Sequence, residues 1–245
     1  TNITQLNGGR PAEAKGSIFK LTANWTPNSD SLFYVTLSEG FRPGLINRPG
    51  GTEVTLETGA TYKIPEVLET DEVINYELGW KTDLADGQLR FNGSLFMVEI
   101  EKLQTTIFDP SITNLFFSDN AADAEVKGLE ADFIYAPDAL AGLTVSGALS
   151  LLDSEYQDFG FFDTYSLQEV DLDGESLTRA PEVTANFGAE WTIPVNASFL
   201  KDIKLRGDVF YSDEYKLTFI DYSQTRQDSY TTGNVSVLFT SPSER

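Results

Sequence analysis

The segment 72–104, EVINYELGWKTDLADGQLRFNGSLFMVEIEKLQ, alternates apolar and polar residues on both sides of one predicted turn. Its first half places apolar side chains at every second position: Ile74, Tyr76, Leu78, Trp80 and Leu84. A period of two predicts a β-strand with one apolar face and one polar face. Asp86-Gly87 then predicts a type I′ hairpin turn, because both central residues of that turn have positive φ. Leu89 and Phe91 resume the alternation on the return strand.

The same reasoning predicts about nine strands along the whole chain, and therefore an all-β fold. Besides the two strands of the hairpin, we expect strands at Ser17–Trp25, Ser31–Leu37, Val126–Tyr135, Leu143–Leu151, Val183–Ile193, Ile203–Tyr211 and Tyr230–Phe239. Several of them have the length of about 9–11 residues with which a tilted strand crosses a bilayer.

The connections between the predicted strands are alternately short and long. The first three long connections are expected at 41–70, 108–122 and 157–179, and a fourth precedes the last strand. In an antiparallel up-and-down sheet, successive turns lie at opposite ends, so all short turns would lie at one end. Transmembrane barrels have this asymmetry, whereas the Greek-key connections of soluble sandwiches give no reason for it.

The aromatic residues agree with a barrel. Trp25, Trp80, Trp191 and Tyr135 all lie close to a predicted short turn, as in the aromatic girdle at a membrane interface. The alternative is that tryptophan lies at strand ends in any β protein.

The polar positions of the predicted strands carry many charges: Glu77, Lys81, Glu130, Asp132, Glu190, Arg206 and Asp208. Such charges suit a water-filled lumen better than the core of a sandwich, where each charge would need a partner. One stretch, Phe96-Met97-Val98, is continuously apolar. We therefore expect a β-bulge near Gly93-Ser94 that shifts the alternation.

Composition narrows the function further. The net charge of -21 disfavours nucleic acid as a partner. The chain has no cysteine and no histidine, which removes thiolate metal ligands, the commonest zinc ligand and the commonest general base. We expect no enzymatic activity, no cofactor and no metal. The mean hydropathy of -0.22 leaves no apolar run long enough for a membrane helix.

Four motifs, in order along the chain, resemble the TonB-dependent outer-membrane receptor family. They are YVTLSEGFRPG at 34–44, EVINYELGWK at 72–81 followed by Asp86-Gly87, NAADAEVKGLE at 120–130, and Arg179-Ala180-Pro181. The resemblance implies an antiparallel up-and-down transmembrane β-barrel, with typically 22 strands, in the outer membrane of a Gram-negative bacterium. Residues 1–245 would be a fragment from the C-terminal half of that barrel, with the plug domain and the closing strands absent.

By the same resemblance, the whole protein would bind a scarce solute such as a siderophore, a vitamin or a glycan. TonB would energise its import through the plug, and membrane lipid would surround the barrel. Two alternatives remain open at this point: a passive porin-like channel, and a soluble β-sandwich that binds or hydrolyses carbohydrate.

Candidate ligand contacts lie in the long connections. Arg42 and Arg48 suit an anionic ligand, and the aromatic side chains Phe161, Phe162 and Tyr165 suit a ligand or a partner. The alternative for the aromatic residues is that they fold back on neighbouring loops. The stretch 171–175, DLDGE, superficially resembles a calcium loop, but no flanking helices are expected, and it is better interpreted as a polar turn.

Overall fold

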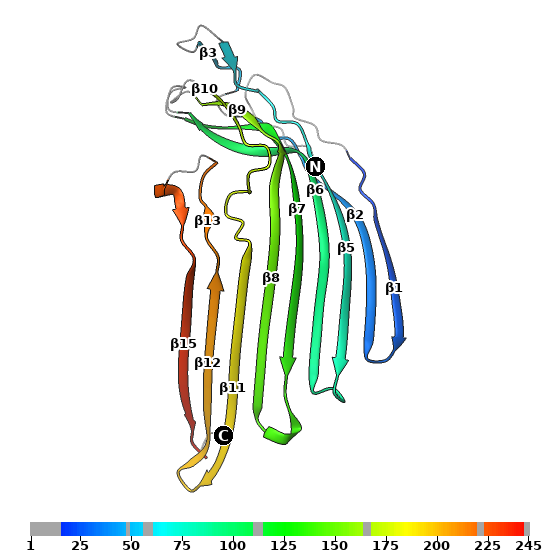
Figure 1. The fold of residues 1–245 in the computed structure, drawn as a ribbon, viewed down its shortest axis with the longest axis vertical. Helices are drawn as coiled ribbons and strands as arrows, with labels where there is room; N and C mark the ends of the chain where they lie inside the picture. The colour runs from blue at the N-terminus through cyan, green and yellow to red at the C-terminus, as the bar shows by residue number, and fades with distance from the viewer. Residues whose placement is uncertain are drawn as a thin grey trace.

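The computed structural model describes residues 16–47, 50–55, 61–109, 115–163, 168–219 and 223–242, with the side chains of a few of them left aside. One antiparallel sheet of nine strands dominates these residues (Figure 1). In spatial order its strands are β1 (Lys20–Asn28), β2 (Ser31–Arg42), β5 (Asp71–Leu84), β6 (Leu89–Asp109), β7 (Leu115–Tyr135), β8 (Leu143–Asp158), β11 (Val183–Ala197), β12 (Leu200–Ser212) and β15 (Tyr230–Thr240). Spatial order equals chain order, which confirms the predicted up-and-down topology.

The remaining elements are short and belong to the connections. They are β3 (Glu53–Thr55), β4 (Thr61–Lys63), the 3-10 turn η1 (Asp138–Leu140), β9 (Gly160–Asp163), β10 (Gln168–Asp171), β13 (Tyr215–Lys216), the 3-10 turn η2 (Ser223–Thr225) and β14 (Arg226–Gln227). Figure 1 shows the short turns at the lower end of the sheet and β3, β9, β10 and β13 towards the upper end. The predicted separation of short and long connections is therefore confirmed.

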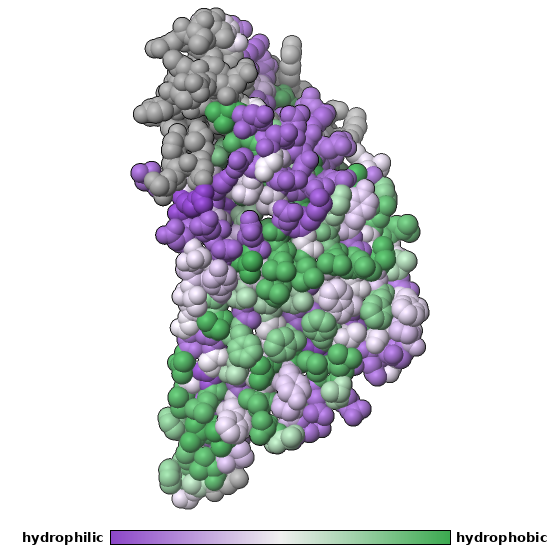
Figure 2. All heavy atoms as spheres, in the orientation of Figure 1, coloured by the Kyte–Doolittle hydropathy of each residue, from purple (hydrophilic) through white to green (hydrophobic). Residues whose placement is uncertain are grey.

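The strand register gives the sheet one apolar face and one polar face. The row Val35, Leu78, Leu95, Leu129, Leu151 and Val183 runs across six strands on the apolar face. Leu78 is 48% exposed and Leu95 45% exposed, so this face has no protein cover among the described residues. Figure 2 shows hydrophobic side chains gathered over the strands, with hydrophilic side chains above them. Such a belt matches the lipid-facing band of a barrel.

The aromatic residues near the short turns lie on the apolar face. Trp25 is directly opposite Phe33, which is opposite Trp80 on the next strand. Trp25, Trp191 and Tyr135 are exposed. Their placement is that of an interfacial girdle.

The turn after β5 has the expected backbone. Asp86 and Gly87 have φ of 55° and 85°, and the Gln88 amide donates to the Ala85 carbonyl at 3.1 Å. Glycine and aspartate tolerate this left-handed region better than other residues, which explains why this dipeptide marks the turn.

The predicted bulge at Gly93-Ser94 is wrong. The register between β5 and β6 is continuous there, and the irregularity lies between Ile100 and Gln104, where Lys102 has φ of 55°. Phe96 needs no shift of phase, because its ring lies over Gly128 on the polar face. The missing side chain at Gly128 makes room for an inward-facing aromatic residue.

The long connection predicted at 108–122 is also wrong in extent. β6 continues to Asp109 and β7 already begins at Leu115, so the hairpin extends well beyond the neighbouring strands. Thr106 and Ser118 pair directly in this extension. In this extension, consecutive polar residues at 104–106 and 118–120 are followed towards the tip by consecutive apolar residues at 107–108 and 115–117. The sequence alternation that marks a half-buried strand is therefore lost.

No helix in the part of the chain that the structure describes is long and apolar enough to cross a membrane.

Candidate functional site

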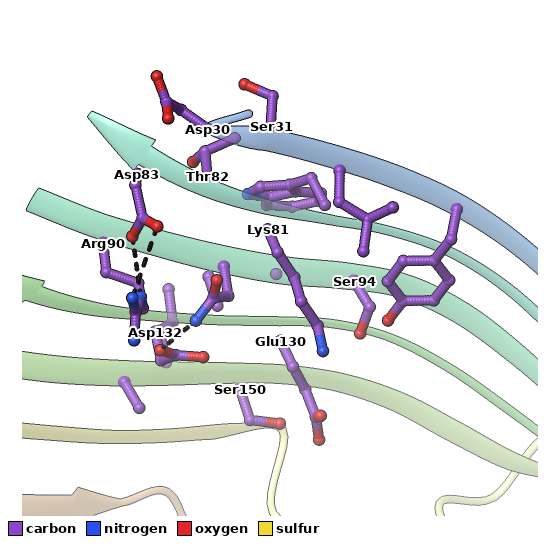
Figure 3. Close-up of a pocket in the computed structure, with 18 of the residues that line it drawn as sticks. Asp30, Ser31, Lys81, Thr82, Asp83, Arg90, Ser94, Glu130, Asp132 and Ser150 are labelled. Carbon is purple, nitrogen blue, oxygen red and sulfur yellow. Dashed lines mark hydrogen bonds and ion pairs between the residues drawn. The ribbon is translucent and has the colours of Figure 1, made fainter. Parts of the chain in front are cut away.

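The polar face is hollowed into a cavity of about 830 Å³ that extends from the β1–β2 turn to β12 (Figure 3). Strand alternation places polar side chains on this side, and the charged residues that line it include Asp30, Lys81, Asp83, Arg90, Glu130 and Asp132. Of the charged positions predicted for the polar face, Lys81, Glu130 and Asp132 line this cavity. We call the polar face around the cavity the polar wall.

Several polar and charged side chains of the polar wall are paired with a neighbour. Arg90 Nε lies 2.9 Å from Asp83 Oδ1, and Lys204 Nζ lies 2.8 Å from Glu190 Oε1. Asn92 donates a 3.0 Å hydrogen bond to Asp132. These pairs are partly exposed, so each contributes little to stability. The charged residues that line the cavity are four carboxylates and two cations, so its lining is polar with an excess of negative charge.

Lys81 and Glu130 differ from their neighbours, because neither takes part in the ion pairs found among the described residues. Both side chains project into the same part of the cavity in Figure 3. An ammonium and a carboxylate thus remain available on the wall for a polar group inside the lumen.

The carboxylates of the polar wall form no metal centre. They come from separate strands, and among the described residues no group of three or more His, Cys, Asp or Glu side chains is placed to hold a metal ion. The stretch 171–175 makes a polar turn, in which the Asp173 amide donates to Asp171 Oδ1 at 3.0 Å and Gly174 has φ of 77°. Glu175 of the same turn forms an ion pair with Lys216.

Above the polar wall, an apolar cluster joins the third and fourth long connections to the sheet. Its buried members are Ala122, Ala124, Tyr156, Phe159 and Leu172. The ring centroids of Tyr156 and Phe159 are 4.9 Å apart, and those of Phe159 and Phe219 are 5.2 Å apart, with the rings edge to face. Burial raises the pKa of Tyr156. We call these five residues, together with the half-buried Ile100, Leu103, Val170, Leu177 and Phe219, the loop cluster.

The loop cluster was not predicted from the sequence as a unit. Phe159 is only 1% exposed and folds back onto β8, which fits the alternative that loop aromatics pack on their neighbours. Phe219 comes from a connection that carries no periodic signal. The sequence signals these two members of the loop cluster only as aromatic residues within polar segments.

Arg42 lies at the end of β2 and is held by Asp71 at the start of β5. Its Nε donates to Asp71 Oδ2 at 2.8 Å, and its Nη2 donates both to Asp71 and to the Gln104 carbonyl. The Asp71 side chain is 4% exposed and that of Arg42 51%. The ion pair thus joins the two ends of the first long connection. It also uses several of the five N–H donors of the Arg42 guanidinium.

Side-chain amides fasten the same connection to the β6–β7 hairpin. Asn120 Oδ1 accepts from the Glu69 amide at 2.7 Å, and Asn120 Nδ2 donates to the Glu69 carbonyl at 3.0 Å. Asn47 exchanges two hydrogen bonds with the backbone of Ser118 in the same manner. Lys102 Nζ adds an ion pair of 2.6 Å to Glu69, and this hydrogen bond raises the pKa of Lys102.

The other predicted contact residues are placed only in part. Phe161 and Phe162 lie on β9, opposite Val170 and Glu169 of β10, and their side chains are outside the described set. Arg48 and Tyr165 lie outside the described residues. Ligand contact by these five residues stays a prediction.

Comparison with known proteins gives the family. A model described as "TonB dependent receptor-like, beta-barrel" matches residues 3–241. The ferric-pyoverdine 358 receptor of Pseudomonas putida is 29% identical over 161 residues, which are 64% of this chain and 17% of that receptor.

Solved structures show the same fold. The ferric yersiniabactin uptake receptor of Yersinia pestis aligns with a TM-score of 0.62 and 17% identity over 89% of this chain and 29% of its own. The ferripyoverdine receptor of Pseudomonas aeruginosa, bound to ferripyoverdine, aligns with a TM-score of 0.60 and 18% identity over 96% of this chain and 28% of its own. The chain thus spans less than a third of the length of each of these relatives. The described residues correspond to part of such a barrel. Because the family model matches nearly all of the chain, the protein belongs to the TonB-dependent receptor-like β-barrel family.

Proposed function

We propose that the complete receptor containing these strands imports a ferric siderophore across the outer membrane of a Gram-negative bacterium, with energy from TonB. The observation that carries this proposal is the separation of faces along the barrel strands. An apolar face meets lipid, and a hollowed polar wall lines a passage for a polar solute. The similar proteins named above are receptors of ferric siderophores, which supports this class of solute over a vitamin or a glycan.

The loops above the polar wall supply the ligand contacts in this proposal. Phe161, Phe162 and Tyr165 offer aromatic surfaces, and Arg48 offers a cation for an anionic ferric complex. Arg42 contributes mainly by holding the first long connection in place, since its guanidinium is paired with Asp71. The 1–245 segment acts as one part of a larger barrel that encloses a plug domain supplied by other parts of the receptor.

Uptake of radioactive iron tests the proposal. The complete receptor is expressed in a strain that lacks its own siderophore receptors, and ⁵⁵Fe uptake is measured over a panel of ferric siderophores with and without TonB. We expect at least one siderophore to be imported, and import to stop without TonB. Uptake of many small solutes that persists without TonB would identify a passive channel instead. A protein that is soluble without detergent and binds glycans would identify a soluble sandwich.

Phe161→Ala with Phe162→Ala tests the loop contacts. We expect the double variant to bind the imported siderophore on the order of tenfold more weakly, as for the loss of aromatic contacts at a binding surface. Phe199→Ala, in the short β11–β12 turn, is the matched control because it lies at the opposite end of the sheet. Equal affinity of all three proteins would remove Phe161 and Phe162 from the site.

A further inference from the structure

The apolar face extends furthest towards the short turns on the hairpin of β11 and β12. Figure 1 shows the β11–β12 turn as the lowest point of the sheet, and Figure 2 shows hydrophobic side chains continuing down to it. Past Trp191, the alternate positions of this face are Ile193 and Val195 on β11 and Ile203 on β12. Val195 is 41% exposed, and Phe199 in the turn is 77% exposed. The tip of this hairpin therefore has an apolar surface without protein cover among the described residues.

The apolar positions of β11 cover more depth than those of β5. On β5 they run from Ile74 to Leu84, ten residue steps or about 34 Å along the strand. At the roughly 40° tilt of barrel strands this is a depth of about 26 Å, which equals the usual apolar band of about 25 Å. On β11 they run from Val183 to Val195, twelve steps, and reach a depth of about 31 Å by the same geometry. The surplus of about 5 Å matches the head-group layer of one leaflet, which is about 5–7 Å thick.

The charge on the apolar face differs between its two ends. Towards the long connections, Glu99, Glu125 and Glu155 lie directly opposite one another on neighbouring strands. Past Trp191, by contrast, the described positions of the hairpin on this face carry a single charge, Lys201, opposite the register shift of β11. Lys201 is exposed and forms no ion pair among the described residues. A phosphate is thus repelled at the end with the long connections and attracted at the end with the short turns.

A proline closes the free edge of the hairpin to strand addition. The Thr192 amide donates to the Gly142 carbonyl at 2.9 Å, and beyond it β11 has no partner on the β8 side among the described residues. Alternate amides of a strand point the same way, so residue 194 would present the next donor on this edge. Pro194 has no amide hydrogen and removes that donor. An apolar tip with a blocked edge suits a lipid surface better than an added strand of another protein.

We propose that the β11–β12 hairpin tip, residues 193–203, anchors the barrel in the phospholipid leaflet on the side of the short turns. Val195 and Phe199 lie among the head groups and the first carbons of the acyl chains, and the Lys201 ammonium donates to a lipid phosphate. An exposed aromatic ring and a cation two residues away are the two parts that anchor a chain at a membrane interface. The anchor does not depend on which solute is imported, but it rests on the apolar face meeting lipid, as in the proposed function.

Spin labels on the complete receptor test the anchor. The chain has no cysteine, so a label at Phe199→Cys reports one position once any cysteine elsewhere in the receptor is replaced. The receptor is placed in vesicles of phosphatidylethanolamine and phosphatidylglycerol. Relaxation of the label by oxygen, which concentrates in lipid, is compared with relaxation by a water-soluble nickel complex. We expect oxygen to dominate at Phe199→Cys and at Val195→Cys, and the nickel complex to dominate at Asp86→Cys in the β5–β6 turn.

Leu78→Cys separates failure of the anchor from failure of the face assignment. If oxygen dominates at Leu78→Cys but the nickel complex dominates at Phe199→Cys and Val195→Cys, the barrel lies in the membrane and the anchor is wrong. The anchor is also wrong if neither reagent reaches Phe199→Cys, because protein then covers the tip. If the nickel complex dominates at Leu78→Cys as well, the apolar face does not meet lipid and the proposed function fails with the anchor.

Lys201→Glu, combined with the label at Phe199→Cys, tests the phosphate contact. We expect the ratio of oxygen to nickel relaxation to fall about twofold to fivefold, the scale of one partly exposed ion contact. Lys201→Arg keeps the charge and should keep the ratio. Added inorganic phosphate should leave the ratio unchanged if the partner is a lipid phosphate. An unchanged ratio in Lys201→Glu would overturn the phosphate contact, and a ratio lowered by free phosphate would assign Lys201 to a soluble anion instead.

Discussion

The Tyr34 hydroxyl donates a 2.5 Å hydrogen bond to Glu77 Oε1, while the Tyr34 ring covers Gly79 on the same strand as Glu77. Side-chain contacts on the polar face thus join β2 and β5 in addition to their backbone hydrogen bonds. The same device recurs elsewhere: Trp80 covers Gly93, Phe96 covers Gly128 and Phe133 covers Gly147. An aromatic side chain lying over a neighbouring glycine packs one strand against the next where no side chain competes for the space.

Gly79→Ala should destabilise the complete receptor by about 1–3 kcal/mol, because a β-carbon there would lie 2.2 Å from the Tyr34 ring. The ring must then move and give up its hydrogen bond to Glu77. Urea unfolding of the receptor in lipid vesicles, followed by tryptophan fluorescence, measures the change.

Two further variants make this prediction specific. Gly188→Ala, also on the polar face, should be nearly neutral, because its nearest neighbour atom would be 3.6 Å away. Tyr34→Ala combined with Gly79→Ala should be less destabilised than the sum of the two single variants. Strict additivity in this double-mutant cycle would show that Tyr34 and Gly79 are not coupled.

Leu78→Arg and Glu77→Arg test which face meets lipid. Leu78 lies in the middle of the apolar belt, where an arginine costs about 2–4 kcal/mol near the bilayer midplane, so assembly should fail or weaken. Glu77 faces the cavity side, and arginine there remains hydrated. Heat-modifiable migration on gels reports the folded fraction of both variants. Comparable assembly of the two would contradict the assignment of the faces.

Asp71→Ala should release the first long connection without unfolding the sheet. The change leaves Arg42 without its main partner and removes acceptors for the Arg42 amide and guanidinium. Because the guanidinium is half-exposed, we expect a local loss of about 1–3 kcal/mol. Hydrogen exchange should accelerate at the Asn47 and Leu68 amides, which bond within this connection.

The control for this prediction is Asp83→Ala. Its partner Arg90 is exposed and both groups lie at the short-turn end, so the loss should not exceed about 1 kcal/mol. Exchange at Asn47 and Leu68 should remain unchanged in this variant. If Asp71→Ala behaves like Asp83→Ala, then Arg42 and Asp71 do not hold the connection.

The sequence is most informative where strands cross the apolar belt. Leu78 and Glu77 could be assigned to opposite faces in advance, because a strand with one face in lipid must alternate and a slip of one residue would reverse every side chain. The same pattern located the short turns. The alternation did not predict the β6–β7 extension. Pairs there such as Thr106 and Ser118 do not alternate between apolar and polar residues, so the sequence shows no strand period.

The contacts above the polar wall were less accessible to sequence reasoning. Asn120 binds Glu69 and Phe159 packs on Phe219 across long stretches of chain, and no local pattern specifies such partners. Arg42 was expected to face a ligand because arginine in a loop suits anions, yet a buried carboxylate at Asp71 competes for it. The sequence places Arg42 beside a strand end, but Asp71 can be identified as its partner only when the register of the two strands is known.

Phe219→Ala should loosen the third long connection although Phe219 belongs to the fourth. Its ring packs edge to face on Phe159, whose carbonyl accepts from the Leu172 amide at 2.9 Å. Loss of the ring should weaken the loop cluster by about 1–2 kcal/mol and accelerate hydrogen exchange at Leu172. Phe199→Ala is the control, because Phe199 is 77% exposed and lies in the β11–β12 turn, outside the loop cluster. If exchange at Leu172 is the same in both variants, the two connections move independently and the aromatic contact does not couple them.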